Sequence, residues 1–290
     1  EMSQTKAQLI DTLVASLLPA SDSSVDIGSN GVRFANGYFD TLYGDGSNLT
    51  GITSITINNN ADNRVITGSG SANTLNGESS LLFDGSMLTV NGIRVGKGAN
   101  AVAGNTVLGE SALDASVSGA NNTAIGKNAL TSLTSAADCT AVGEDALAGV
   151  TTGSNNIGVG VDALKACTTG SGNIAVGRRA LDAVTDGNLN VAVGQSSLGQ
   201  NTADNNTALG YIALGSNTTG TSNVAVGHEC LDANTTADNN TAVGKGTMGN
   251  NTTGAGNTAI GKSAMGNNTT ASDNTAIGLN ALLTNTTGTN

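Results

Sequence analysis

Three cysteines and the single histidine are the residues whose types most readily suggest chemistry. They are Cys139, Cys167, Cys230 and His228. A thiolate beside an imidazole is a common catalytic nucleophile, and both side chains are frequent zinc ligands. However, three widely spaced cysteines imply no disulfide framework, and no second His or Cys stands at ligand spacing from His228. We therefore interpret the cysteines as small, semi-buried residues, and we expect no metal, no cofactor and no enzymatic activity.

Two further patterns resemble chemical motifs. Residues 256–263 read Gly-Asn-Thr-Ala-Ile-Gly-Lys-Ser, which fits the phosphate-binding loop pattern. Such a loop needs a strand before it and a helix after it, so that backbone amides cradle the phosphates. Here the segment is one copy of a longer repeat, so we expect no nucleotide site. The adjacent carboxylates of Glu144 and Asp145 would point to opposite sides of a strand and would make a poor acid–base pair.

The composition favours a repetitive β protein over a globular enzyme. The chain of 290 residues has 41 Gly, one Pro, no Trp and only 2% aromatic residues, and 11% of its residues are charged. An average globular domain has about 25% charged residues. The 38% of apolar residues argue against disorder, and the net charge of −11 argues against nucleic-acid binding. No apolar stretch approaches the roughly 18 residues of a membrane span, so we expect no membrane insertion.

A glycine that follows a short apolar run recurs from about residue 105. Eleven copies are present, with a period of about 17 residues, and a single step, between Gly194 and Gly210, is one residue shorter. The anchor glycines are Gly109, Gly126, Gly143, Gly160, Gly177, Gly194, Gly210, Gly227, Gly244, Gly261 and Gly278. Positions in each copy are numbered below from its anchor glycine. A repeat of this length suits one coil of a β-solenoid, and at about 4.8 Å per coil the eleven copies predict a rod roughly 50 Å long.

The residues around each anchor predict a short strand and a second apolar row. Positions −3 and −1 are Thr, Ile, Val or Leu in every copy, and position −2 is Ala in nine copies. This alternation is typical of a strand, and we expect the larger side chains to point inward. Position +4 is Leu, or Met in Met248 and Met265, which predicts a second inward row. Positions +1 and +2 vary freely, which indicates solvent.

Asparagine at position −4 is expected to have a structural role. It occurs in ten copies, and Cys139 replaces it in the eleventh. Asn tolerates left-handed backbone at corners, and stacked Asn side chains form ladders, while glycine supplies the corner itself. The ladder is expected to comprise Asn122, Asn156, Asn173, Asn190, Asn206, Asn223, Asn240, Asn257 and Asn274, with the corners at the anchor glycines from Gly126 to Gly278.

Two more positions carry information. Position +7 is apolar in early copies, from Leu133 to Val184, but is Asn from Asn201 onward. We hypothesise that the cross-section or the packing partner changes near residue 200. The later Asn residues Asn251, Asn268 and Asn285 match glycosylation acceptors, although they also arise from the repeat. Position +8 is Thr in ten copies.

A homotrimer is expected, because each coil offers a thin core. The small side chain at position −2 would point outward and allow close approach of another chain. Residues 3–18 are typical of an amphipathic helix, with Ile10, Leu13 and Leu17 at coiled-coil spacing. The predicted organisation is a helix over residues 1–19, an interwoven β connector over 20–104 and a solenoid shaft over 105–290. The β runs expected in the connector are Ser54–Asn58, Arg64–Thr67, Ser80–Phe83 and Met87–Val90.

Several segments resemble a known group of proteins. Residues 26–38, 44–52, 62–68 and 81–92 are similar to connector segments of bacteriophage tail fibres. The Asn-Thr-Ala-Ile-Gly repeats resemble both phage fibres and the heads of trimeric autotransporter adhesins, and this resemblance implies a trimeric left-handed β-roll. The period of the repeats here is longer than that of the usual adhesin head. The chain starts at Glu1 and ends at a repeat boundary, which indicates a piece or mature product of something longer.

The resemblance implies a structural and adhesive shaft of a phage tail fibre that presents a host-binding tip. Expected partners are two further copies of the chain, other virion tail proteins and a host-surface glycan. The alternatives are a bacterial surface adhesin or extracellular filament subunit, and an ice-binding solenoid. Ice-binding faces need outward Thr at i and i+2, whereas the pairs here are at i and i+1, of which one would face outward on a strand.

Overall fold

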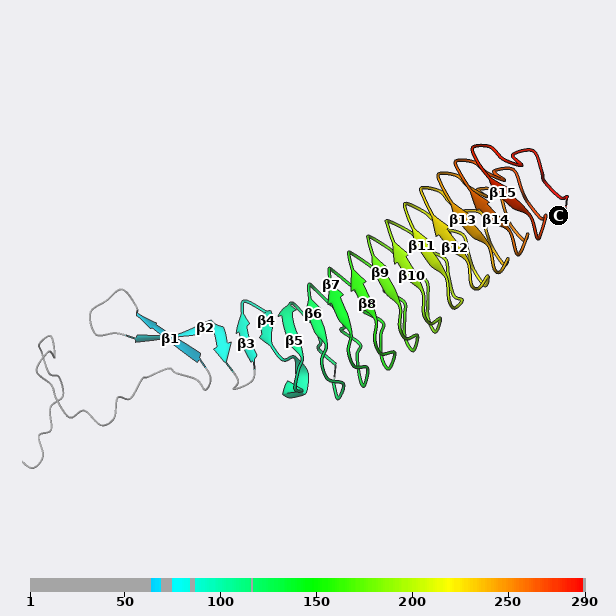
Figure 1. The fold of residues 1–290 in the computed structure, drawn as a ribbon. Coiled ribbons are helices and arrows are strands. Elements are labelled where there is room, and N and C mark those ends of the chain that lie inside the picture. Colours follow the sequence, from blue (N-terminus) through cyan, green and yellow to red (C-terminus); the bar gives the residue numbers. More distant parts are fainter. Residues whose placement is uncertain (1–63, 69–74, 84–86, 116, 289–290) are drawn as a thin grey trace, which may run out of the picture. The chain divides into compact units, whose positions relative to one another are not determined.

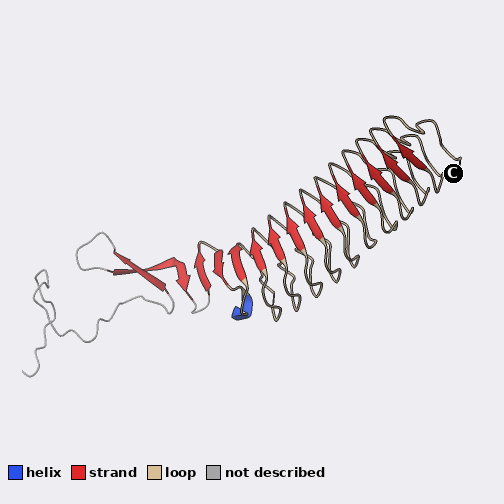
Figure 2. Cartoon of the chain, viewed as in Figure 1, coloured by secondary structure: helices blue, strands red, loops and turns tan. Residues whose placement is uncertain are grey.

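The computed structural model describes residues 64–68, 75–83, 87–115 and 117–288. All of them belong to one compact unit, Ile57–Asn290. The helix expected over residues 3–18 and the β run Ser54–Asn58 lie outside the described residues. Within these residues, fifteen strands form one sheet in which each strand pairs with its neighbours in sequence (Figures 1 and 2).

The first four strands form an antiparallel meander. They are β1 (Arg64–Gly68), β2 (Leu75–Phe83), β3 (Met87–Val90) and β4 (Ile93–Gly96). Strand β4 pairs antiparallel with the first strand of the repeats, and the 3-10 turn η1 (Ala99–Ala101) lies between them in the chain. Three of the expected β runs are therefore strands.

The repeats form a parallel stack with one strand per coil. The strands are β5 (Thr106–Gly109), β6 (Thr123–Ile125), β7 (Thr140–Val142), β8 (Ile157–Val159), β9 (Ile174–Val176), β10 (Val191–Val193), β11 (Thr207–Leu209), β12 (Val224–Val226), β13 (Thr241–Val243), β14 (Thr258–Ile260) and β15 (Thr275–Ile277). Each residue pairs with its equivalent in the next coil, as Ala124 does with Ala141. The expected all-β solenoid, with one coil for each copy of the repeat, is thus confirmed.

The one shorter copy leaves the sheet unbroken. Ala192 in β10 pairs with Ala208 in β11, in the same register as every other pair of coils. The missing residue is accommodated in the loop, where the Ala203 carbonyl accepts hydrogen bonds from Asn190 and Asn201. In the next coil, the Gly220 carbonyl accepts from Asn206 and Asn217 in the same way.

The two faces of the strands are the reverse of the expected ones. Ala at position −2 is buried in every strand from β6 onward that carries it, whereas the flanking β-branched residues are half-buried or exposed. Ala points inward because position −2 packs against the Leu row at position +4, where there is little space. A Cβ on Gly158, which occupies this position in β8, would lie 2.8 Å from Cδ1 of Leu147. Only a small residue fits there.

The second apolar row is confirmed. Residues at position +4 from Leu113 to Met265 are completely buried, and the buried apolar residues form one continuous core along the stack. The Leu residues reach the interior from a left-handed backbone; Leu147, for example, has a φ of 52°. Each is surrounded by the coils before and after it, which offsets the local strain.

Position +7 stays inside the coil through residue 200. Val184 and Asn201 are both completely buried, so the position is not displaced toward solvent. What changes is its bonding: the early side chains pack in the apolar core, whereas the later Asn side chains bond one another.

Candidate functional site

The asparagines at position −4 form the expected ladder inside the solenoid. From Asn105 to Asn257, the Oδ1 atom of each accepts a hydrogen bond of 2.8–3.0 Å from the backbone N–H of the equivalent residue one coil later. Most of their Nδ2 atoms donate to a loop carbonyl of that next coil; Asn223, for example, donates to Ala237 at 2.8 Å. These asparagines are all buried. The ladder therefore satisfies backbone groups that the narrow coil would otherwise leave unpaired.

The left-handed backbone expected at these asparagines lies one residue earlier. Positions −5 from Asn121 to Asp273 have φ values of 57–70°, whereas the ladder asparagines themselves have no positive φ. The ladder side chain has to point inward from the start of the strand, so the corner is made by the residue before it.

The anchor glycines form the expected corners. Those from Gly126 to Gly278 have φ values of 125–140°, which L-residues rarely adopt. From Gly109 to Gly261, a Cβ would also lie 2.3–2.8 Å from the carbonyl group of the next anchor glycine. Both the backbone conformation and the close stacking of coils therefore require glycine.

A second ladder, at position +7, was not expected from the sequence. The Asn side chains bond from coil to coil, with Asn217 donating to Asn201 and Asn234 donating to Asn217, both at 2.7 Å. Where it begins, Asn206 of the first ladder donates to Asn201 at 3.2 Å and joins the two. Asn251 and Asn268 are buried in this ladder, which leaves them inaccessible to glycosylation in the folded chain.

The cysteines and the histidine are not brought together. All three cysteines are buried, and burial raises the pKa of Cys167 to about 11 and that of Cys230 to about 12. His228 is exposed, and its ring lies 5.2 Å from that of Tyr211. In the part of the chain that the structure describes, no group of three or more His, Cys, Asp or Glu could hold a metal ion.

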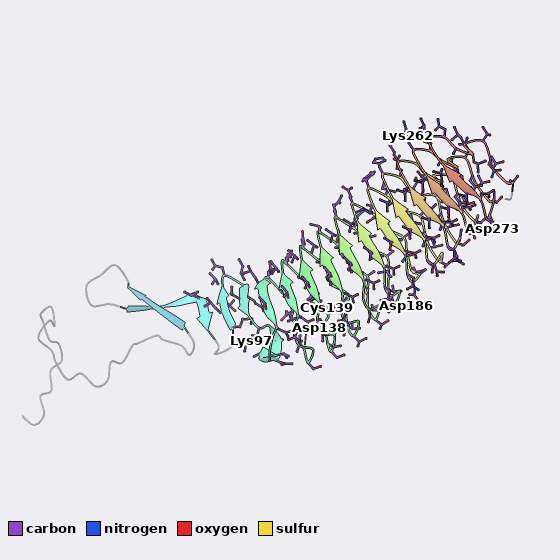
Figure 3. All side chains as sticks on the ribbon, viewed as in Figure 1. Lys97, Asp138, Cys139, Asp186, Lys262 and Asp273 are labelled. Carbon is purple, nitrogen blue, oxygen red and sulfur yellow. The ribbon has the colours of Figure 1, made fainter. Side chains whose placement is uncertain are left out.

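The segment that matches a phosphate-binding loop is one coil of the solenoid. Its strand β14 is followed by a turn rather than a helix. Lys262 lies on one edge of the coil stack, opposite Asp186 and Asp273 (Figure 3). Among the described residues, no helix is long and apolar enough to cross a bilayer.

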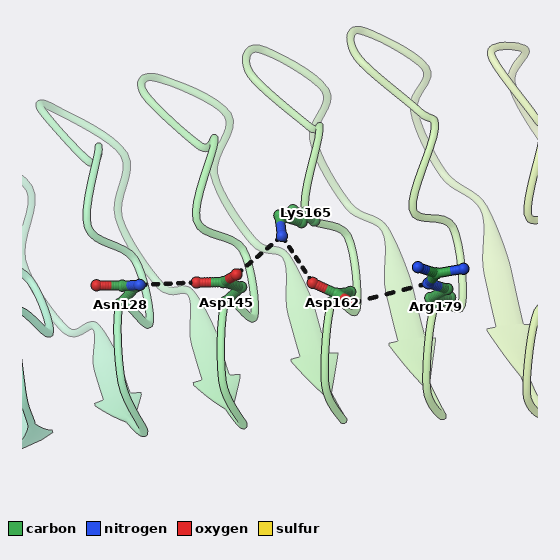
Figure 4. A network of polar contacts seen from close by, with 5 residues as sticks. All are labelled: Asn128, Asp145, Asp162, Lys165 and Arg179. Carbon is green, nitrogen blue, oxygen red and sulfur yellow. Dashed lines mark hydrogen bonds and ion pairs between the residues drawn. The ribbon is translucent and has the colours of Figure 1, made fainter.

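Charged side chains at positions +2 and +5 fill one surface of the early coils (Figure 4). Lys165 forms ion pairs of 2.8 Å with both Asp145 and Asp162, and Asn128 donates to Asp145 at 2.9 Å. The hydrogen bond from Lys165 lowers the pKa of Asp145. Glu144 is exposed and takes no part in this network. The contacts join successive coils and stabilise their stacking rather than forming an acid–base pair.

Two rows of Thr reach the surface together. The position +8 hydroxyls donate to the backbone carbonyl of the next coil, as Thr151 does to Thr168 at 3.1 Å. At position +9 the row is exposed, and it includes Thr152 and Thr169. The expectation that one of each pair would turn inward is wrong, because these residues lie in a bend rather than a strand.

A hollow of about 290 Å³ lies on the late coils. It is lined by side chains and glycines at positions +2, +5 and +6 of the copies that begin at Gly227, Gly244, Gly261 and Gly278. This is the surface that the ion pairs of Lys165 cover in the early coils. No family model, curated protein or solved structure matches the chain.

Proposed function

We propose that the chain is a structural shaft of a phage tail fibre, which holds a host-binding tip away from the virion. The observation that carries this proposal is the unbroken in-register sheet from β5 to β15. Two internal Asn ladders bond coil to coil alongside it. Such a stack resists bending and transmits load along its axis, because each coil is bonded directly to the next.

The proposed shaft is a parallel homotrimer that associates through the outward aliphatic row at position −1. Exposed members of this row include Val159 at 36%, Val176 at 37% and Ile260 at 41%. The row at −3 lies beside it on the same face of the strands; it is Thr in seven copies and Ile or Val in four, and most of it is half-buried. A row of aliphatic side chains that reaches the surface at least in part in every coil marks an interaction site. This row replaces the Ala position as the proposed contact.

The test is the molar mass of the full chain in solution by light scattering, before and after heating in detergent. We expect a detergent-resistant trimer of three times 28.3 kDa. Electron microscopy of the same sample should show straight rods. A stable monomer would contradict the proposal.

Two alternatives share part of this support. A bacterial surface adhesin or filament subunit would have the same trimeric shaft, and open-ended polymers in the light-scattering experiment would favour the filament. The paired Thr rows are the observation that favours an ice-binding solenoid. A monomer with thermal hysteresis in freezing assays would support that function over a shaft.

A further inference from the structure

The hollow on the late coils is a groove built from the repeat itself. We call it the coil groove, and its polar lining comprises Glu229, Asp232, Asn250, Ser263 and Asn267, with Leu283 at one end. These residues come from four successive copies, so the groove runs along the stack over about three inter-coil spacings of roughly 4.8 Å each.

Glycines open the groove at positions where other copies carry side chains. Position +5 is Lys165 in an early coil, where it bonds Asp145 and Asp162, but it is Gly249 and Gly266 in two late coils. Position +2 is likewise Gly246 in the first of those coils. The surface that ion-paired side chains fill around Lys165 is therefore left open at Gly246, Gly249 and Gly266.

The amide groups in the groove have open hydrogen-bonding capacity. Asn250 uses its Nδ2 to donate to the Gly266 carbonyl at 2.9 Å, and the same atom lies 3.4 Å from Oδ1 of Asn267. Three other polar groups of the groove form no hydrogen bond with any described residue: Nδ2 of Asn267, Oδ1 of Asn250 and the Ser263 hydroxyl. The groove thus offers a donor, an acceptor and a hydroxyl that is both.

Charge and apolar surface narrow the class of ligand. Glu229 and Asp232 supply carboxylates at one end, so phosphate, sulfate and acidic sugars are repelled. Nδ1 of His228 lies 3.3 Å from Oε2 of Glu229, but among the described residues no group of three or more His, Cys, Asp or Glu could hold a metal ion. At the other end, Leu283 is half-buried and apolar. A ligand with many hydroxyl groups, an apolar C–H face and no negative charge matches this lining.

We propose that the coil groove binds a short neutral saccharide. The carboxylates and Oδ1 of Asn250 accept hydrogen bonds from its hydroxyl groups, Nδ2 of Asn267 donates to a hydroxyl oxygen, and Leu283 contacts the C–H face of the ring. An open groove with few contacts binds weakly, with a Kd on the order of millimolar. The inference goes beyond the shaft role and does not depend on it, because the groove lies within one chain.

The experiment is saturation-transfer difference NMR on the full chain. The probes are glucose, galactose, mannose and N-acetylglucosamine, with N-acetylneuraminic acid as an anionic comparison. We expect signal from at least one neutral sugar, with the Kd obtained by titration, and none from the acid. Absence of signal from all four neutral sugars would overturn the proposal, as would equal binding of the anionic one.

Matched variants place the binding site. Gly249→Thr fills the groove with the residue that Thr131 already supplies at the same position, and its Cβ meets atoms at 3.4 Å or more, so the coil should fold. Gly199→Thr makes the same change beside Asp182, outside the groove. We expect Gly249→Thr and Asn267→Ala each to weaken binding at least fivefold and Gly199→Thr to leave it unchanged. Unchanged binding in Gly249→Thr would overturn the inference.

The test of sugar binding and the test of the shaft proposal can fail independently of each other. Light scattering on the same samples reports the oligomeric state of each variant, and circular dichroism reports its fold. Sugar binding by a monomer would contradict the shaft and support the groove, whereas a trimer without sugar binding would do the reverse.

Discussion

The copy that contains Cys139 shows what one ladder side chain contributes. In other copies, the backbone N–H of the ladder asparagine donates to the amide oxygen one coil earlier. At Asn156 this N–H meets the sulfur of Cys139, which is a weak acceptor. The ladder is therefore interrupted at one position, where both neighbouring coils are otherwise regular.

Restoring the ladder should stabilise the solenoid. We expect Cys139→Asn to raise the free energy of unfolding by about 1 kcal/mol, because it supplies an acceptor for a buried N–H. Denaturant unfolding followed by circular dichroism measures the change. The control is Cys230→Asn, which would bury an amide in the apolar core and should lower stability by about 1–3 kcal/mol. If Cys139→Asn has no effect, the acceptor argument is wrong.

Two glycines contrast a position that requires glycine with one that does not. Gly177 has a φ of 134°, and its Cβ would lie 2.7 Å from the carbonyl of Gly194. We expect Gly177→Ala to lower stability by about 3 kcal/mol through backbone strain and overlap. Gly249→Ala should be neutral or stabilising by about 0.5 kcal/mol, because its conformation is ordinary. Equal thermal midpoints for the two variants would refute this account.

The sequence identified the structurally important positions of the repeat. It was less reliable in showing whether the side chains at those positions point inward or outward. Recurrence at a fixed spacing identified the ladder asparagines and the corner glycines. Alternation with a period of two fits either face of a strand, so it could not show that Ala points inward. That choice depends on the width of the coil, where Leu147 lies across from Gly158, and this distance is not encoded by either residue alone.

At the scale of the coil, each element depends on its immediate neighbours. The strand of three residues is too short to be stable by itself, and most of its hydrogen bonds go to the coils before and after it. The burial of the second ladder at position +7 could not be predicted, because a run of Asn is more typical of a surface loop. The ladder is buried because neighbouring coils supply its partners from within the solenoid.

Buried thiols can report whether coils open separately or together. At pH 8 the three cysteines should stay unreactive toward Ellman's reagent in the folded chain, because they are buried and protonated. In increasing denaturant, we expect Cys139 and Cys167 to react together, since their coils are close, and Cys230 to follow its own transition if the stack opens in parts. Single-cysteine variants assign the signals. Rapid labelling without denaturant would show that the coils are not closed.

The same thiols should make the free energy of unfolding vary with pH in the alkaline range. Burial raises the pKa of Cys167 to about 11 and of Cys230 to about 12, above the ordinary value of 9.0. Between these values the unfolded chain loses thiol protons that the folded chain keeps, so the free energy of unfolding should fall as pH rises from about 9 to 11. A variant with all three cysteines changed to Ala should lose this part of the dependence. An identical pH profile in that variant would argue against the effect.

At the scale of the molecule, the reversal of the strand faces changes where another copy would bind. A row of Ala on the outside would have offered a close, narrow contact, but the coil keeps that row for its own core. The β-branched side chains are then left outside in every coil, and they follow the axis of the stack without interruption. The same sequence pattern therefore supports self-association through a broader and more apolar surface than the one first expected.

Charge placed on this surface should separate the chains without unfolding them. Val159 and Val176 are exposed and pair in adjacent strands, so Val159→Lys with Val176→Lys puts two like charges in the proposed interface of each chain. We expect the trimer to become a folded monomer by light scattering, with an unchanged circular dichroism spectrum, because buried like charges repel strongly while exposed lysines are tolerated. The matched control changes Thr152 and Thr169 to Lys on the Thr rows, also in adjacent coils and exposed, and should remain a trimer. If the trimer persists in the Val variant and is lost in the Thr variant, the interface lies on the Thr rows. The aliphatic row would then no longer support the shaft proposal.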